Sequence, residues 1–188
     1  MTVMNRKIDL LVKAIKDPIK AVCRVLALVN NKLKLTEAIK VSGKGERLVI
    51  KRWESAKNST DFTTLAHIQR YEWISLYVKN LQCLDVGCGS GYGTFYLARK
   101  GVNRIVGVDI SAYAVEFAKK HYRNENLEFM QMDGLDLKFR DNSFDTVICF
   151  DVLEHIDQEH QSKLISEIAR VLRKTGVAYI GCPNAALS

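Results

Sequence analysis

The chain has 188 residues, 47% of them hydrophobic, and this length supports one substantial core rather than two full domains. Five widely spaced cysteines without a CxxC pair support neither a disulfide framework nor a structural zinc site, and are typical of reduced core thiols in a cytoplasmic protein. The net charge of +7 is segregated, with 13 Lys and Arg against 4 Asp and Glu in residues 1–52, and 15 against 17 in the remainder. Such segregation favours a basic arm that meets an anionic surface over a nucleic-acid-binding cleft, so we expect nucleic acid not to be a partner.

Residues 1–45 are predicted to form this basic arm. Apolar residues recur at three- and four-residue steps across residues 4–35 with Lys and Arg between them, a pattern typical of amphipathic helices. Asp17 and Pro18 resemble an N-cap and first turn and divide the arm into two helices. A membrane span, which needs about 20 apolar residues, is not expected because Arg24 interrupts the most apolar run. The arm therefore either lies peripherally on an anionic membrane face or packs on protein.

Residues 42–60 are polar and contain Gly43 and Gly45, which predicts a hinge. The linker is placed at residues 46–64, and residues 65–188 form the main domain. Within that domain a helix is predicted over 65–80. Short β-branched runs then alternate with helical patterns. The runs are 82–88, 104–110, 127–133, 144–150 and 176–182, and the helical patterns are 94–100, 112–122 and 161–174. This alternation predicts an α/β fold with a Rossmann-like, doubly wound, mostly parallel sheet, whose ligands bind at the carboxyl ends of the strands.

Carboxylates stand at those predicted strand ends. The first three predicted strands finish at or beside Asp85, Asp109 and Asp133, and the fourth runs into Asp151 and Glu154. A ring of carboxylates favours a ligand with positive character and disfavours a pyrophosphate. In agreement, the frames GCGSGY and GSGYGT both lack Gly or Ala at the sixth position of a dinucleotide fingerprint. A strand-end Asp can instead cap the following helix or turn, and that alternative stays open for Asp109 and Asp133.

The segments LDVGCGSGYG, VGVDIS, QMDGLDL and FDTVICFDVLEHI, in this order and spacing, resemble class I S-adenosylmethionine-dependent methyltransferases of the type 11 kind, over residues 65–183. ERLVI followed by HIQRYEW also resembles, more loosely, members linked to cell-surface glycan and lipopolysaccharide assembly. The resemblance implies S-adenosylmethionine as cofactor and no metal. It implies a set of cofactor-binding residues: Tyr71, Asp85, Gly87, Gly89, Gly91, Asp109, Ile110, Asp133, Gly134, Leu135, Phe150 and Val152.

The resemblance also gives these residues roles. Asp85 and the three glycines would surround the methionine part of the cofactor, with Tyr71 over its carboxylate end. Asp109 would accept the ribose hydroxyls and Asp133 the adenine amino group, with backbone contacts from Gly134 and Leu135. Ile110 would lie against the adenine face, and Phe150 and Val152 would line the pocket below the sulfonium.

His155 follows the fourth predicted strand in LEHI, and its ordinary pKa suits a general base for a hydroxyl acceptor. Its alternative role is to cap or pack against the helix that begins near Asp157, whereas His67, His121 and His160 are interpreted as surface or helix-face residues. The (D/N)PP(Y/F) turn of enzymes that methylate base amino groups or glutamine amides is absent. The resemblance therefore favours O-methylation of a small-molecule, lipid or glycan acceptor.

The family's sheet normally carries two further strands, and this chain stops soon after strand 176–182. We expect another chain, such as a second copy in a homo-oligomer, or the arm to cover that edge. Three alternatives remain open: a catalytically silent S-adenosylmethionine-binding module or fragment that assembles with another chain, a nicotinamide-dependent oxidoreductase, and an RNA methyltransferase that uses the basic arm. The predicted location is the cytoplasm, with peripheral binding at the inner membrane face.

Overall fold

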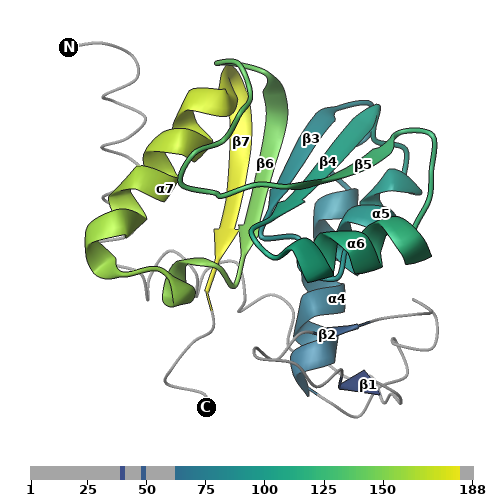
Figure 1. Ribbon diagram of the computed structural model, residues 1–188. Helices are drawn as coiled ribbons and strands as arrows, with labels where there is room; N and C mark the ends of the chain where they lie inside the picture. Colours follow the sequence, from purple (N-terminus) through teal and green to yellow (C-terminus); the bar gives the residue numbers. More distant parts are fainter. Residues whose placement is uncertain (1–38, 41–47, 50–61, 183–188) are drawn as a thin grey trace.

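A computed structural model describes residues 39–40, 48–49 and 62–182 of the chain (Figure 1). The predicted helices of the arm and most of the predicted linker lie outside these residues. Near the border between the predicted arm and the predicted linker, β1 (Ile39–Lys40) pairs antiparallel with β2 (Leu48–Val49). No helix in the described part of the chain is long and apolar enough to cross a membrane.

The main domain is built on a five-stranded sheet whose strands are all parallel. Its strands are β3 (Gln82–Val86), β4 (Arg104–Asp109), β5 (Leu127–Gln131), β6 (Phe144–Phe150) and β7 (Leu172–Gly181), in the order β5-β4-β3-β6-β7. The chain moves outward from β3 to β5 and then returns to the other side of β3 at β6. This reversal is the topological switch point at which doubly wound sheets bind ligands, and it confirms the predicted fold class.

Helices cover both faces of the sheet, as Figure 1 shows. One face is covered by α4 (Phe62–Ser75), α5 (Tyr92–Ala98) and α6 (Ala112–His121), and the other by α7 (Gln158–Val171), which follows the short 3-10 turn η1 (Leu153–His155). Strand residues alternate between the two cores: Cys83 and Ile105 join the first, Leu84 and Val106 the second. Because both faces of the inner strands β3, β4 and β6 are buried, their sequences are largely apolar, whereas the edge strands β5 and β7 are only partly buried.

The buried side chains supply the main stabilising term. Ile68 and Ile74 of α4, together with Leu164 and Ile168 of α7, are at most 1% exposed. Burying each such side chain contributes about 1.5–3 kcal/mol. Cys83, Cys88 and Cys149 are also buried, and burial raises the pKa of the Cys83 thiol to about 12, as expected for a core thiol.

Several predicted boundaries are wrong by a few residues. The helix predicted over 65–80 begins at Phe62 and ends at Ser75, where the Ser75 hydroxyl donates to the Glu72 carbonyl oxygen and a tight turn follows. The helix predicted over 161–174 gives way to β7 at Leu172, because Leu172 pairs with Phe144 across an irregularity in the β6 ladder. Here strand pairing overrides local helical periodicity.

Within the described residues, β7 forms one edge of the sheet and pairs only with β6. Val177 near its middle is 50% exposed. An apolar strand with one unpaired edge is a template for further pairing. The covering of this edge by a second copy of the chain stays a prediction.

Candidate functional site

The turn after β3 holds three glycines in the left-handed region, with φ of 73° at Gly87, 56° at Gly89 and 84° at Gly91. Side chains are excluded from the outer two by packing: a Cβ on Gly87 would lie 2.2 Å from Val152 Cγ2, and one on Gly91 would lie 2.6 Å from Ala118 Cβ. A Cβ on Gly89 would meet no atom within 4 Å. The backbone at Gly89 is therefore open to a ligand, whereas the other two glycines serve the packing.

Asp85 lies directly before this turn and is 1% exposed. Its carboxylate accepts hydrogen bonds from Thr94 Oγ1 at 2.7 Å and from the Tyr71 hydroxyl at 3.1 Å. Burial raises the pKa of Asp85 to about 7, against the two hydroxyls, which lower it, and with a smaller contribution from the charge of Asp109. A buried carboxylate of this kind is costly to ionise unless a cation joins it.

The carboxylate of Asp109 connects the glycine turn to α6. Oδ2 accepts the backbone N–H of Gly89 at 2.8 Å, and Oδ1 accepts that of Ser111 at 2.9 Å. The cap of α6 is Ser111, whose hydroxyl accepts the N–H of Ala114, so Asp109 is not the helix cap. Its bond with the Ser111 N–H does stabilise the turn before α6, which is part of the alternative role left open from the sequence. A carboxylate has about four acceptor positions, so these two hydrogen bonds do not prevent Asp109 from also accepting a ligand hydroxyl. Ile110 beside it is 66% exposed, which leaves an apolar surface next to this polar anchor.

Asp133, by contrast, is exposed and lies two residues beyond β5. Its Oδ1 accepts the N–H of Leu135 at 2.8 Å, so it stabilises the local turn, the alternative role left open from the sequence. Gly134 packs closely, because a Cβ there would lie 3.0 Å from Leu164 and 3.1 Å from Val86. Binding of an adenine amino group by Asp133 stays a prediction.

The end of β6 lies against the glycine turn and α4. The ring of Phe150 meets that of Tyr71 edge-on, with centroids 5.7 Å apart, and Val152 covers Gly87. Tyr71 also fills the space beside Gly93, where an added Cβ would lie 2.2 Å from its ring. The predicted residues Tyr71, Phe150 and Val152 are thus brought together with the glycine turn.

His155 belongs to the 3-10 turn η1 and is exposed. Its backbone N–H donates to the Val152 carbonyl oxygen, which places it one turn beyond the end of β6. Its use as a general base stays a prediction.

His67 is a residue whose place the sequence interpretation missed. Instead of lying on the surface, its side chain is 21% exposed at the site, with Nδ1 2.7 Å from the Tyr92 hydroxyl oxygen and Nε2 3.1 Å from Asp151 Oδ2. Arg70 was also missed, and its guanidinium lies 2.8 Å from Asp151 Oδ1. The available signal was the spacing HIQRY, which places His67, Arg70 and Tyr71 on one face of α4.

These groups meet at the carboxyl edge of the sheet. The arrangement offers a buried carboxylate to a cation, two strand-end carboxylates to hydrogen-bond donors, an apolar surface at Ile110 and an open backbone at Gly89. A ligand that combines positive charge with hydroxyl and amino groups satisfies all four features, whereas a ligand rich in phosphate would oppose the carboxylates.

Comparison with known proteins agrees with this chemistry. Residues 84–180, just over half of the chain, match the family model described as a methyltransferase domain. An O-methyltransferase of Aspergillus nomiae is 31% identical over 118 residues, which are 57% of this chain and 52% of that protein. A Mycobacterium tuberculosis protein named "Probable S-adenosylmethionine-dependent methyltransferase" is 35% identical over 101 residues, 54% of this chain and 35% of its own.

Among solved structures, the PH0226 protein of Pyrococcus horikoshii superposes with a TM-score of 0.58 and 31% identity, over 64% of this chain and 58% of that protein. The chain spans about half the length of the first of the two curated relatives and about a third of the second.

Proposed function

Since the chain belongs to the class I S-adenosylmethionine-dependent methyltransferase family, we propose that it transfers a methyl group to an oxygen of a small-molecule, lipid or glycan acceptor. The observation that carries the proposal is the carboxylate-lined edge around Gly89, where an added Cβ would meet open space. Close backbone approach and buried negative charge are what a sulfonium cofactor with an ammonium group requires.

The residues of the site fit S-adenosylmethionine. Asp85 would face its ammonium group, Asp109 its ribose hydroxyls and Ile110 its adenine face, with Phe150 and Val152 below the sulfonium. When bound, the cofactor supplies a methyl group on a positively charged sulfur. The protein then holds the acceptor in line and excludes water, and such alignment is worth on the order of 7–11 kcal/mol in favourable cases.

An oxygen acceptor is supported by the absence of the (D/N)PP(Y/F) turn after β6, where this chain has FDVLEH, and by the name of the Aspergillus relative. The proposal extends to lipid-linked glycan acceptors at a membrane surface, which the basic residues 4–35 would approach. An alternative is a catalytically silent module that binds S-adenosylmethionine and assembles with another chain. It is favoured by the edge position of β7 in the described sheet.

We expect calorimetric titration to give micromolar binding of S-adenosylmethionine and no binding of NAD. Asp109→Ala should abolish the binding, because it removes the ribose acceptor and also the carboxylate that holds the Gly89 N–H. Asp136→Asn, which changes an exposed carboxylate outside the site, is the matched control. Binding of NAD in place of S-adenosylmethionine would overturn the proposal.

We also expect His155→Gln to lower kcat for a hydroxyl acceptor by about 100-fold, the usual contribution of a general base, with unchanged affinity for S-adenosylmethionine. Steady-state kinetics on an acceptor found by screening, paired with calorimetry on the same variant, measures both quantities. His160→Gln, on the exposed start of α7, controls for loss of a nearby imidazole. An unchanged kcat in His155→Gln would remove His155 from the mechanism.

A further inference from the structure

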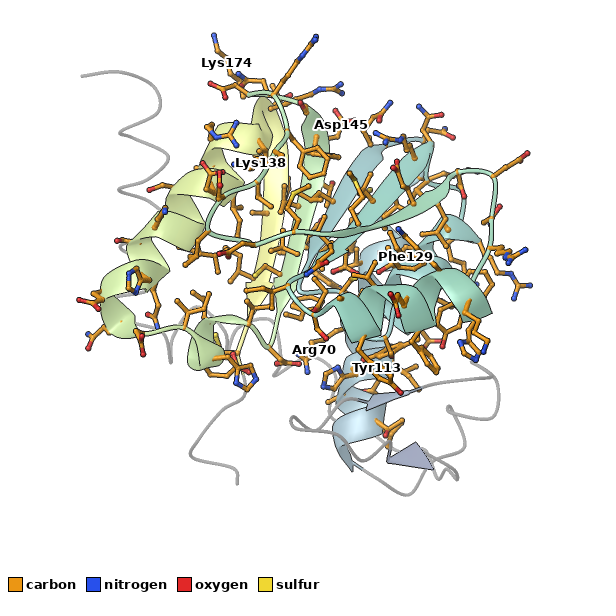
Figure 2. All side chains as sticks on the ribbon, in the orientation of Figure 1. Arg70, Tyr113, Phe129, Lys138, Asp145 and Lys174 are labelled. Carbon is orange, nitrogen blue, oxygen red and sulfur yellow. The ribbon has the colours of Figure 1, made fainter. Side chains whose placement is uncertain are left out.

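One face of α4 connects the ends of two strands. Tyr71 donates its hydroxyl to Asp85 at the end of β3, while Arg70 lies 2.8 Å from Asp151 Oδ1, just beyond β6. The Arg70 guanidinium also lies over the ring of Phe150, 5.1 Å from its centroid. Figure 2 shows Arg70 at the carboxyl edge of the sheet, opposite the edge at which Asp145 is labelled.

Asp151 holds an unusual backbone conformation at this junction. Its φ of 54° is in the left-handed region, which costs a non-glycine residue about 1–2 kcal/mol and which Asp and Asn tolerate best. Its backbone N–H donates to the Gly181 carbonyl oxygen at 2.8 Å, so β7 fixes the position from which the carboxylate reaches α4.

The carboxylate of Asp151 faces two basic side chains of α4. Oδ1 accepts the hydrogen bond from Arg70. Oδ2 lies 3.1 Å from His67 Nε2 but outside hydrogen-bond geometry, and this oxygen has no hydrogen-bond partner within the described part of the chain. The Asp151 and Arg70 side chains are only 16% and 19% exposed, so the pair is shielded from the screening that weakens surface ion pairs.

We propose that Asp151 is a positioning residue, which holds α4 against the carboxyl edge of the sheet through Arg70 and His67. This position of α4 brings the Tyr71 hydroxyl to the Asp85 carboxylate, as cofactor binding requires. The inference rests on the proposed function. Buried residues such as Ile68 and Ile74 anchor α4 to the core, and the polar contacts of α4 are made at the ends of β3 and β6. Asp151 acts through other residues and is not assigned a catalytic role.

Asp151→Asn tests this role, because Asn keeps the size of the side chain and its tolerance of positive φ but removes the charge. In the ligand-free full chain, amide hydrogen exchange should become faster in α4 and stay unchanged in β3 and β4. If α4 is then seated in about a tenth of the molecules, the affinity for S-adenosylmethionine falls about tenfold. Arg70→Gln should give the same two changes while leaving the Asp151 backbone untouched.

The matched control is Asp145→Asn, at the opposite end of β6. Asp145 also pairs with an arginine, Arg173, and accepts the backbone N–H of Gln82, but it lies at the amino edge of the sheet. This variant should keep both the affinity for S-adenosylmethionine and the protection of α4. The double variant Arg70→Gln/Asp151→Asn should bind no more weakly than the weaker single variant, because both changes break one link.

The outcomes are separable. Unchanged exchange in α4 and unchanged affinity in Asp151→Asn would overturn the positioning role while the proposed function stood. Additive losses in the double variant would overturn it too, since Arg70 would then act on the cofactor independently of Asp151. If the wild-type chain did not bind S-adenosylmethionine, the proposed function would fail, and the exchange of α4 in the variant would still decide the role of Asp151.

Discussion

Asp85→Asn is expected to change stability and cofactor binding in opposite directions. In the ligand-free protein at pH 8, the buried Asp85 carboxylate must be ionised against its desolvation cost, because burial holds its pKa at about 7. Removing that charge should raise the free energy of unfolding by roughly 2–4 kcal/mol, less whatever the amide loses in its contacts with Tyr71 and Thr94. The same substitution removes the partner of the cofactor's ammonium group, so binding of S-adenosylmethionine should fall at least 100-fold.

The pH dependence follows from the direction of the shift. The folded protein binds the Asp85 proton more tightly than the unfolded chain, whose pKa is near 3.8, so this group's contribution to stability falls as pH rises from about 4 to about 7. Urea unfolding at pH 4 and pH 8 should therefore show a gain for Asp85→Asn at pH 8 and little at pH 4. An equal gain at both values would mean that packing, and not charge, is responsible.

Cofactor affinity in the wild-type protein should show the opposite trend over this window. Ionised Asp85 attracts an ammonium group, so binding should strengthen as pH rises toward 7. It should weaken again above about 8, where an α-amino group loses its proton. Calorimetry across this range, with the Asn variant as the flat reference, measures the effect.

The second large effect is expected from substitutions in the glycine turn, where Gly91→Ala should mainly lower stability and Gly89→Ala should mainly lower cofactor affinity. Gly91→Ala forces an L-residue to a φ of 84° and places its Cβ 2.6–2.8 Å from Ala118 and Phe129. Backbone strain and overpacking together should lower the free energy of unfolding by about 2–5 kcal/mol.

Gly89→Ala meets no neighbouring atom and should lower stability by only about 1–2 kcal/mol, from backbone strain at a φ of 56°. Its methyl group would occupy the open space beside the turn, so the loss of S-adenosylmethionine affinity should be larger than any effect on stability. Thermal unfolding with and without the cofactor distinguishes the two variants, because a ligand that no longer binds no longer raises the Tm. Equal destabilisation by both substitutions would contradict the assignment of Gly89 to the ligand.

The inner strands of the sheet were predictable because both of their faces are buried. Runs such as FDTVICF are apolar throughout, and the carboxylates that end them stand out against that background. Asp85 and Asp109 could be found in this way, as could the glycine turn. Periodicity could not place the start of β7, since Leu172 continues the helical pattern of α7 and becomes strand only by pairing with Phe144.

The α4 contacts could not be predicted for a different reason. Arg70 and Asp151 are 81 residues apart, and nothing local in either segment indicates the other. His67 therefore resembled an ordinary residue of an amphipathic helix, whereas His155 lies beside a recognisable motif and was the histidine that the sequence favoured as a general base. Even the spacing of His67, Arg70 and Tyr71 indicates only a shared face, not what that face meets.

The long-range hydrogen bonds at the strand ends also determine when the site can exist. Arg70 precedes the sheet, Asp151 follows its fourth strand, and Asp151 is itself bonded to Gly181 at the end of the fifth. Contacts of such wide sequence separation form only after the intervening chain has closed, so no early folding unit contains the complete junction. During synthesis, Tyr71 of α4 can therefore meet Asp85 once β3 is made, whereas Arg70 gains its partner Asp151 only after β6, and β7 holds that partner later still.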